Sequence, residues 1–289
     1  MKKILITGAS GQLGKTLKNI FKSRYNIIPT AKSHYFRQKN YFLDITNHLL
    51  IKDIVAATAP DIIINLAALT NVDLCEKRPD LAHSINFVGL ENLVKIFNGP
   101  IIQLSTDYVF DGKIGQYSEN SSVNPINEYG KTKLKAENFL KENSKDSLII
   151  RTNVLYDYIS KSSASFLNWV VKSLQDGEKI NVVDDQWNNP TWTKSIAVLI
   201  DRAIKRELNG LIHWGDYDYI SRFDFANKIA DTFKLKKNLI QPIKTFELNQ
   251  IAPRPLKGGL NTDMAKSILN LEPSKISDCL EHIFGNINS

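Results

Sequence analysis

The chain has 289 residues, a length typical of two domains or of one large domain with an appendage. Hydrophobic residues make up 43% and charged residues 23%, which excludes a disordered protein. The net charge of +7 suits an anionic ligand, but the basic residues form no block typical of nucleic-acid binding. Cys75 and Cys279 have no metal-binding or redox spacing, and no apolar run approaches the ~20 residues that cross a bilayer. We therefore expect a cytoplasmic protein with no membrane or nucleic-acid partner.

Short apolar runs alternate with helical patterns through the first half of the chain. We predict strands over residues 4–6, 26–28, 41–43, 61–66, 101–104 and 148–150. Helices are predicted over residues 12–23, 47–58, 81–98 and 129–143. Continuous apolar runs separated by helices indicate parallel strands that are buried on both faces. The alternation predicts an α/β fold with a doubly wound parallel sheet of the Rossmann type.

The alternation weakens after residue 150. Loop-like segments at 157–163, 184–191 and 251–259 separate single helices that we predict over 166–175 and 223–233. We expect residues 1–150 to form a dinucleotide-binding domain and residues 151–289 to form mainly a smaller, discontinuous substrate-binding lobe. The short run at 210–214 is predicted to return to the main sheet as a strand.

A glycine-rich segment, Gly8-Ala9-Ser10-Gly11-Gln12-Leu13-Gly14, lies between the first predicted strand and the first helix. Glycines at such a junction permit a tight turn, close approach of a pyrophosphate and close helix–strand packing. The helix N-terminus adds free N–H groups and the positive end of its dipole. We therefore predict a dinucleotide site that includes Gly8, Ser10, Gly11, Gln12, Leu13 and Gly14.

The choice of nicotinamide cofactor is predicted from the charges that follow. NAD-specific enzymes hold the adenosine ribose with a carboxylate about 20 residues beyond the glycines, whereas the additional phosphate of NADP needs a cation. No Asp or Glu occurs between Gly14 and Asp44, and Lys32 and Ser33 follow the second strand. We expect a preference for NADPH, with Lys32 at the phosphate. The alternative is that Lys32 and Arg37 lie on a solvated loop and that NADH is used as well.

Tyr129 and Lys133 stand four residues apart on a predicted helix, so their side chains share one face. A tyrosine with its usual pKa near ~10 is a poor proton donor at neutral pH, and a nearby ammonium group lowers that pKa. Ser105-Thr106-Asp107 directly follows a strand, at the sheet edge where ligands bind in such folds. The two patterns together indicate a site for acid catalysis.

Several motifs resemble those of one enzyme family. The Gly-x-x-Gly-x-x-Gly spacing resembles the extended short-chain dehydrogenase/reductase family. The segment from Ser105 to Gly112, Ser-Thr-Asp-Tyr-Val-Phe-Asp-Gly, looks like the dTDP-4-dehydrorhamnose reductase branch of that family. The other segments that carry this likeness are Asn65–Asp73, Asp185-Gln186, Asn189-Pro190-Thr191 and Arg254-Pro255. The resemblance extends from about residue 3 to residue 262.

The resemblance implies reduction of the C4 ketone of a deoxysugar nucleotide by a nicotinamide cofactor. Its catalytic triad would be Thr106, Tyr129 and Lys133, with Ser105 as the alternative source of the hydroxyl. Tyr129 would protonate the alkoxide, and Thr106 would stabilise it by a hydrogen bond. Lys133 would orient the nicotinamide ribose and lower the pKa of Tyr129.

Further contacts are implied by the same resemblance. Those to the cofactor would come from Asp44, Ile45, Ala67, Ala68, Thr70 and Ser105, besides Tyr129 and Lys133. Those to the substrate would come from Thr70, Val72, Asp107, Asn153, Gln186, Trp187 and Arg254. Asp44 would bind the adenine amine, or it caps the helix that begins near Thr46. Arg254 would clamp the substrate diphosphate, or it is a surface arginine in a proline-rich turn.

The chain departs from this branch at four places. Asn153-Val154 replaces a Ser-Trp pair, Trp187-Asn188 stands where a glycine is usual, and Gly258 stands where a serine is usual. Trp187 would refill the space left at Val154, or it lies on a surface loop. Lys15-Thr16 carries no carboxylate where some members hold a bridging Mg²⁺, so we expect no metal. The reaction type is therefore more firmly predicted than the sugar.

Two other functions remain open at this stage. One is a nucleotide-sugar epimerase or dehydratase, although Asp107-Tyr108 departs from the Asp-Glu pair usual in dehydratases. The other is a non-catalytic, nucleotide-binding regulatory subunit, because the regulatory subunit of methionine adenosyltransferase resembles the same branch. We expect a monomer or a homodimer.

Overall fold

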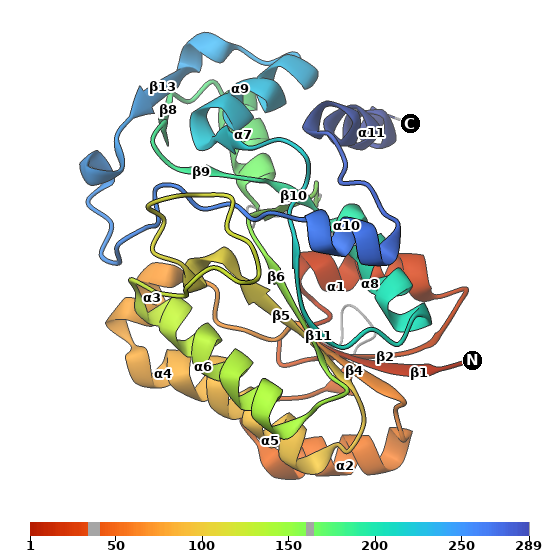
Figure 1. Cartoon of the computed structure of the whole chain (residues 1–289). Coiled ribbons are helices and arrows are strands. Elements are labelled where there is room, and N and C mark those ends of the chain that lie inside the picture. Colours follow the sequence, from red (N-terminus) through yellow and green to blue (C-terminus); the bar gives the residue numbers. More distant parts are fainter. Residues whose placement is uncertain (34–40, 160–164, 289) are drawn as a thin grey trace.

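The computed structural model describes residues 1–33, 41–159 and 165–288, and within them seven parallel strands form one central sheet (Figure 1). In spatial order the strands are β3 (Tyr41–Phe42), β2 (Asn26–Ala31), β1 (Lys3–Thr7), β4 (Ile62–Asn65), β5 (Ile101–Thr106), β6 (Leu148–Thr152) and β11 (Gly210–Trp214). The chain builds outward from β1 in one direction and then, from β4, in the other. This confirms the predicted doubly wound α/β fold, with its topological switch point between β1 and β4.

Side-chain alternation along the strands fills a separate core on each face of the sheet. Ile4 and Ile6 of β1 point to one face, where α1 (Gln12–Phe21), α8 (Thr193–Lys205) and α10 (Asp263–Leu269) pack. Leu5 points to the opposite face. The helices on that face are α2 (His48–Thr58), α5 (Gly89–Ile96) and α6 (Glu128–Asn143). Burial on both faces explains the runs of apolar residues within the strands.

A smaller lobe with its own core stands over the carboxyl ends of the strands, where β6 and β11 lead into it (Figure 1). Its helices are α7 (Phe166–Gln175), α9 (Arg222–Thr232) and α11 (Ile276–Asn288). Its strands form three short pairs: β8 (Ile180–Val183) with β13 (Ile240–Ile243), β7 (Leu155–Tyr156) with β10 (Thr191–Trp192), and β9 (Trp187–Asn188) with β12 (Ile220–Ser221). Tyr156, Phe225 and Leu280 are fully buried in the core of this lobe.

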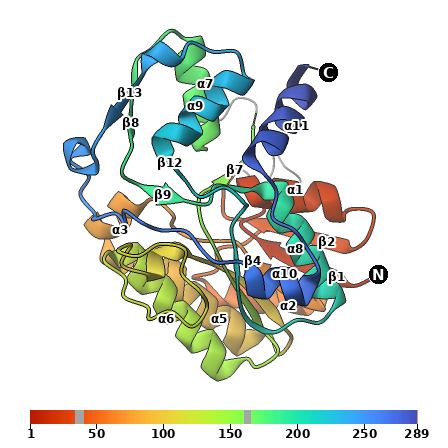
Figure 2. The same cartoon turned by 45° about the horizontal axis from the view of Figure 1, so that its top comes forward.

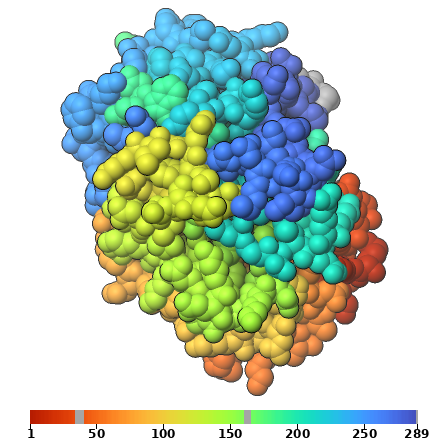
Figure 3. Space-filling view, viewed as in Figure 1, coloured from red at the N-terminus to blue at the C-terminus, as the bar shows by residue number. Residues whose placement is uncertain are grey.

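The segment after β5 packs against the segment that leads into α10, as the space-filling view shows (Figure 3). Backbone hydrogen bonds join Gly112 to Lys257, Gln116 to Gly258, and Tyr117 to Gly259. Residues widely separated in sequence are thereby brought together beside the end of β5.

The sequence patterns missed or displaced several helices. In place of the helix predicted over 81–98, the structure has α4 (Pro79–His83), a π-helical segment (Ser84–Val88) and then α5. A further short helix, α3 (Val72–Lys77), precedes them. Short 3₁₀ turns, also not predicted, occur at Asp107–Val109, Lys237–Leu239 and Thr245–Leu248. Neither α8 nor α10, both absent from the prediction, has a capping hydrogen bond from the side chain that precedes it. The usual start signal of a helix is therefore missing at α8, which follows Trp192, whereas α10 follows Thr262, a residue typical of that position.

The close packing of α1 on the glycine-rich turn generates a test of the fold. A Cβ at Gly14 would lie 2.6 Å from the Cα of Ala9, whereas a Cβ at Gly285 of α11 meets no atom within 4 Å. We predict that Gly14→Ala lowers the free energy of unfolding by about 1–3 kcal/mol through overpacking. Gly285→Ala should raise it by about 0.5–1 kcal/mol, the gain of a better helix former. Urea unfolding of both variants measures this, and equal midpoints would contradict it.

Candidate active site

The glycine-rich turn has the backbone geometry that a pyrophosphate site requires. Gly8 has a φ of +62°, and a Cβ there would lie 2.9 Å from the backbone nitrogen of Ala67. No described side chain caps the N-terminus of α1 at Gly11. The Leu13 side chain is buried in the core, and the Gln12 Nε2 donates to the carbonyl of Asp157 at 3.0 Å. The backbone N–H groups of the turn are therefore available to bind an anion.

Lys32 and Asp44 lie next to each other beyond the ends of β2 and β3. Their Nζ and Oδ2 atoms form an ion pair at 2.7 Å, and the Lys32 side chain is 64% exposed. Burial raises the pKa of Asp44, but hydrogen bonds from Lys32 and Thr46 outweigh it and lower the pKa overall. Asn47 caps α2, so the alternative that Asp44 is the helix cap is wrong. Arg37 lies outside the described residues.

The neighbours of these residues are only partly available to a ligand. The Ile45 side chain is buried in the core and packs so closely on Gly89 that a Cβ there would overlap it. The Ile45 carbonyl accepts a hydrogen bond from Asn92 Nδ2 at 3.2 Å. Ser10 is half-buried, and Ser33 is exposed beside Lys32. A contact from Ile45 to a cofactor would therefore use its backbone.

Three hydrogen-bonding side chains link β1, β4 and β5 beside the switch point. Thr7 Oγ1 donates to Asn65 Oδ1 at 2.5 Å, and Asn65 Nδ2 donates to Gln103 Oε1 at 2.7 Å. The backbone nitrogen of Ala67 donates to Thr7 Oγ1 at 3.1 Å. Ala67 and Ala68 thus start a fixed loop, which continues through exposed Thr70 to half-buried Val72 at the start of α3. The sequence reading did not identify this polar network.

Close packing of α6 against the end of β5 brings Thr106 and Tyr129 together. A Cβ at Gly130 would overlap the carbonyl oxygen of Tyr108, so only glycine permits this approach. The Tyr129 phenol hydrogen-bonds to Thr106, and its ring meets that of Tyr108 edge to face with 5.7 Å between centroids. Lys133 is buried one turn further along α6. The structure therefore gathers the predicted triad at one end of β5.

Burial controls the protonation of Tyr129 and Lys133. Burial raises the pKa of Tyr129, and the hydrogen bond with Thr106 only partly offsets that effect. The phenol is therefore neutral at pH 7 and carries the proton that an acid must donate. Burial lowers the pKa of Lys133 to about 8, and its Nζ donates to the Leu104 carbonyl at 2.5 Å. The expectation of a lowered Tyr129 pKa is thus wrong for the free protein.

Asn127, another residue that the sequence reading missed, fixes the N-terminus of α6. Its Oδ1 accepts from the Gly130 nitrogen at 2.9 Å, and its Nδ2 donates to the Pro253 carbonyl at 2.9 Å. Glu76 of α3 accepts from the Glu128 nitrogen at 3.0 Å. The N-terminus of α6 is therefore anchored from two sides. An Asn directly before a helix was the signal that could have shown this.

Behind Lys133, a buried polar network includes Ser105. Ser105 Oγ donates to Glu137 Oε1 at 2.5 Å, and Arg151 holds the same carboxylate through Nη2 at 2.6 Å. Arg151 Nη1 lies 3.3 Å from His213 Nε2. Burial and the neighbouring Arg151 lower the pKa of His213 to about 3, so its ring is neutral. The Ser105 hydroxyl faces this network, which leaves only its backbone for a cofactor.

On the substrate side, Asp107 lies against the turn that carries Gly258. Asp107 is buried, its Oδ2 accepts from the Gly259 nitrogen at 3.3 Å, and burial raises its pKa to about 6. A Cβ at Gly258 would lie 2.6 Å from that oxygen, which explains the missing side chain. Trp187, 37% exposed, receives a hydrogen bond from Gly258 and packs beside Tyr219 with 5.8 Å between ring centroids.

The remaining predicted substrate residues use their polar groups within the protein. Gln186 Nε2 donates to Thr245 Oγ1 at 3.0 Å, and buried Asn153 hydrogen-bonds to Thr191 at 2.9 Å. The Arg254 side chain is 8% exposed, with its Nη2 3.0 Å from Asp73 Oδ1 and its Nη1 2.9 Å from the Ala252 carbonyl. The charge of Arg254 is therefore already balanced by Asp73.

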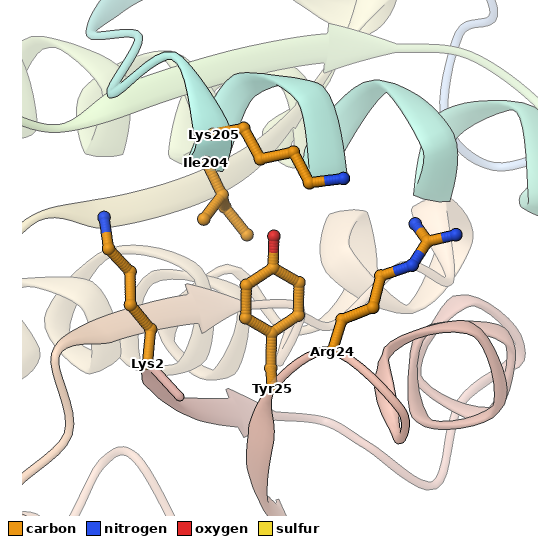
Figure 4. A pocket seen from close by; sticks show the side chains of 5 residues that line it. All are labelled: Lys2, Arg24, Tyr25, Ile204 and Lys205. Atoms are coloured by element: carbon orange, nitrogen blue, oxygen red, sulfur yellow. The ribbon is translucent and has the colours of Figure 1, made fainter.

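Two cavities are lined by none of Thr106, Tyr129 and Lys133. One of about 480 Å³, at the amino end of β1, is lined by Lys2, Arg24, Tyr25, Ile204 and Lys205 (Figure 4). Two of the basic side chains that line this cavity form ion pairs with Asp201, Arg24 at 2.7 Å and Lys205 at 2.8 Å. Another, of about 770 Å³, lies between α1 and α11. In the described parts of the chain no cluster of metal-ligating side chains occurs, and no helix is long and apolar enough to span a membrane.

The chain matches a family model along almost its entire length. The model, described as RmlD substrate binding domain, matches residues 1–288. dTDP-4-dehydrorhamnose reductase of Aggregatibacter actinomycetemcomitans is 32% identical over 98% of both chains. Methionine adenosyltransferase 2 subunit beta of Xenopus laevis is 32% identical over 88% of this chain and 78% of that protein.

A solved structure agrees with both the sequence match and the fold. The crystal structure of dTDP-4-dehydrorhamnose reductase from Bacillus anthracis, in complex with NADP, superposes with a TM-score of 0.90. It is 34% identical and covers 99% of this chain and 100% of its own. The chain therefore belongs to the RmlD substrate-binding-domain family, the dTDP-4-dehydrorhamnose reductase branch of the extended short-chain dehydrogenases/reductases.

Proposed function

We propose that this protein reduces the C4 ketone of a deoxysugar nucleotide with NADPH, as an oxidoreductase of activated-sugar biosynthesis. The observation that carries the proposal is the gathering of Thr106, Tyr129 and Lys133 beside the switch point of a sheet whose first turn suits a pyrophosphate. The NADP complex of the Bacillus anthracis reductase supports the cofactor. The proposal places the enzyme in the cytoplasm, as a monomer or homodimer.

The chemistry divides between cofactor and protein. Bound NADPH supplies a hydride to C4, and a proton to the C4 oxygen completes the alcohol. Tyr129, neutral at pH 7, donates that proton, and Thr106 hydrogen-bonds to the same oxygen as negative charge develops. Lys133 lies buried one turn along α6, where its ammonium group serves the nicotinamide ribose. On this proposal Asp44 and Lys32, which form an ion pair at 2.7 Å, bind the adenosine end of the cofactor.

Cofactor stoichiometry tests the proposal directly. A reductase oxidises one NADPH for each alcohol formed, whereas an epimerase or dehydratase oxidises none overall. The likeness to methionine adenosyltransferase 2 subunit beta favours a second candidate, a non-catalytic regulatory subunit. We expect stoichiometric NADPH consumption with a 4-keto-6-deoxy sugar nucleotide. Conversion without NADPH consumption would support the epimerase or dehydratase. No turnover across a panel of such sugars, together with co-purification of a partner enzyme, would support the regulatory subunit.

Removal of the phenol tests the proton donor. Tyr129→Phe should reduce kcat by about 10²–10⁴-fold, the usual contribution of a positioned acid, because the ring stays and only the proton is lost. The affinity for NADPH should stay within twofold. Tyr217→Phe, at an exposed tyrosine, is the matched control. A Tyr129→Phe enzyme with more than half of the wild-type kcat would show that another group donates the proton.

Lys32 tests the cofactor preference. We expect a higher kcat/KM with NADPH than with NADH, since Lys32 exchanges its exposed ion pair with Asp44 for the cofactor phosphate. Lys32→Ala should weaken NADPH binding by about 10- to 100-fold and leave NADH almost unchanged. Lys22→Ala, at an exposed lysine after α1, controls for net charge. Equal losses for both cofactors would exclude this role of Lys32, and a wild-type preference for NADH would contradict the prediction itself.

A further inference from the structure

Glu137 is a fully buried acidic residue on the same helix as Tyr129 and Lys133. It follows Lys133 by four residues in α6, so the two side chains share one face of the helix. In both ribbon views α6 lies beside α5 on one face of the central sheet (Figure 2). A buried carboxylate is unfavourable unless several partners replace its hydration. Its place one turn from Lys133 therefore indicates a role beyond packing.

Ser105 and Arg151 hold the Glu137 carboxylate in one position. Ser105 Oγ donates to Oε1 at 2.5 Å, and Arg151 donates to Oε1 through Nε at 2.9 Å and to Oε2 through Nη2 at 2.6 Å. Arg151 Nη1 lies 3.3 Å from His213 Nε2, and the guanidinium carbon lies 5.1 Å from the centre of the Phe110 ring. The carboxylate is thus a fixed negative charge that links α6 to β5 and, through Arg151, to β6 and β11.

The buried ammonium group of Lys133 depends on a negative charge nearby. Burial lowers the pKa of Lys133 to about 8, and the charge of Glu137 acts against that effect. The Lys133 Nζ donates to the Leu104 carbonyl at 2.5 Å, a neutral acceptor that does not balance its charge. Loss of the carboxylate would therefore lower the pKa of Lys133 further and leave a neutral amine at neutral pH.

Other ionisable groups near this part of α6 do not supply the charge that Lys133 needs. Asp107, whose pKa burial raises to about 6, acts on the pKa of Tyr129 and not on that of Lys133. Arg151 is cationic and already paired with Glu137. Three further groups are neutral at pH 7 because burial raises their pKa: Tyr108, Tyr129 and Cys75.

We infer that Glu137 is a positioning residue for the proposed reduction, and that its fixed carboxylate keeps Lys133 in the cationic form. The inference rests on the proposed function. As Tyr129 donates its proton, a phenolate remains, and a cationic Lys133 one turn away stabilises that phenolate where a neutral amine does not. Glu137 acts on the reaction through Lys133 and not by contact with the substrate.

The pH dependence of kcat/KM, measured with NADPH and a 4-keto-6-deoxy sugar nucleotide, tests this role. In the wild type kcat/KM should fall as the pH rises through about 8, where Lys133 loses its proton. In Glu137→Gln the same fall should be centred at about pH 6–7, because an ammonium group without its neighbouring anion has a lower pKa. Relative to wild type, the variant should be about 5- to 50-fold slower at pH 8 and within about threefold at pH 6.

Three further variants separate the charge of Glu137 from its part in the fold. Glu137→Asp keeps the carboxylate and should restore the wild-type pH profile. Glu137→Met combined with Arg151→Met replaces the buried ion pair by an apolar pair, which keeps the chain folded, and should still shift the fall in kcat/KM to lower pH. Glu142→Gln removes the same charge from an exposed site on α6 and should leave the profile unchanged.

The remaining outcomes count against the inference or against the proposed function. If kcat/KM of Glu137→Gln and of the double variant falls at the wild-type pH, the inference is overturned. A loss that is equal at every pH overturns it as well, since it reflects a disturbed fold. A wild-type enzyme that binds NADPH but reduces no such sugar contradicts the proposed function. The pH dependence of NADPH binding, followed by fluorescence titration of the same variants, then tests the charge of Lys133 by itself.

Discussion

The contact between the backbone of α6 at Gly130 and the Tyr108 carbonyl determines the geometry of the proposed catalytic site. Any side chain at Gly130 would overlap that oxygen, so glycine alone lets the helix approach the end of β5. Tyr129 thereby reaches Thr106, and Lys133 reaches the Leu104 carbonyl. Asn127 holds the helix from the other side. The site thus depends on backbone packing, which fixes its geometry before any ligand binds.

The surroundings of this contact give Tyr129 and Lys133 the protonation states that the proposed reaction requires. Burial keeps the Tyr129 phenol protonated, and it leaves Lys133, with a pKa of about 8, mainly cationic at pH 7. The charges behind them are internally balanced, since Glu137 is paired with Arg151. Oriented donors in such a site need no rearrangement as charge develops on the substrate oxygen.

The sequence predicted the parts of the molecule that depend on local patterns. The apolar runs and the glycine spacing predicted the sheet and its first turn. The predicted triad of Thr106, Tyr129 and Lys133 consists of side chains that lie near the same end of β5. Pairings between distant residues leave no local pattern. The ion pair of Arg254 with Asp73 was therefore invisible before folding. For the same reason the pKa of Tyr129 was misjudged, because burial depends on tertiary packing.

The most direct test of this account is the kcat/KM of Gly130→Ala, measured with NADPH and a 4-keto-6-deoxy sugar nucleotide. The account predicts a loss of about 100-fold in a protein that still folds, because a displacement of the helix by roughly 1 Å separates Tyr129 from Thr106. Gly285→Ala, in the unobstructed helix α11, should keep wild-type kcat/KM. A Gly130→Ala enzyme with wild-type kcat/KM would show that the close approach of α6 to β5 does not position the catalytic groups.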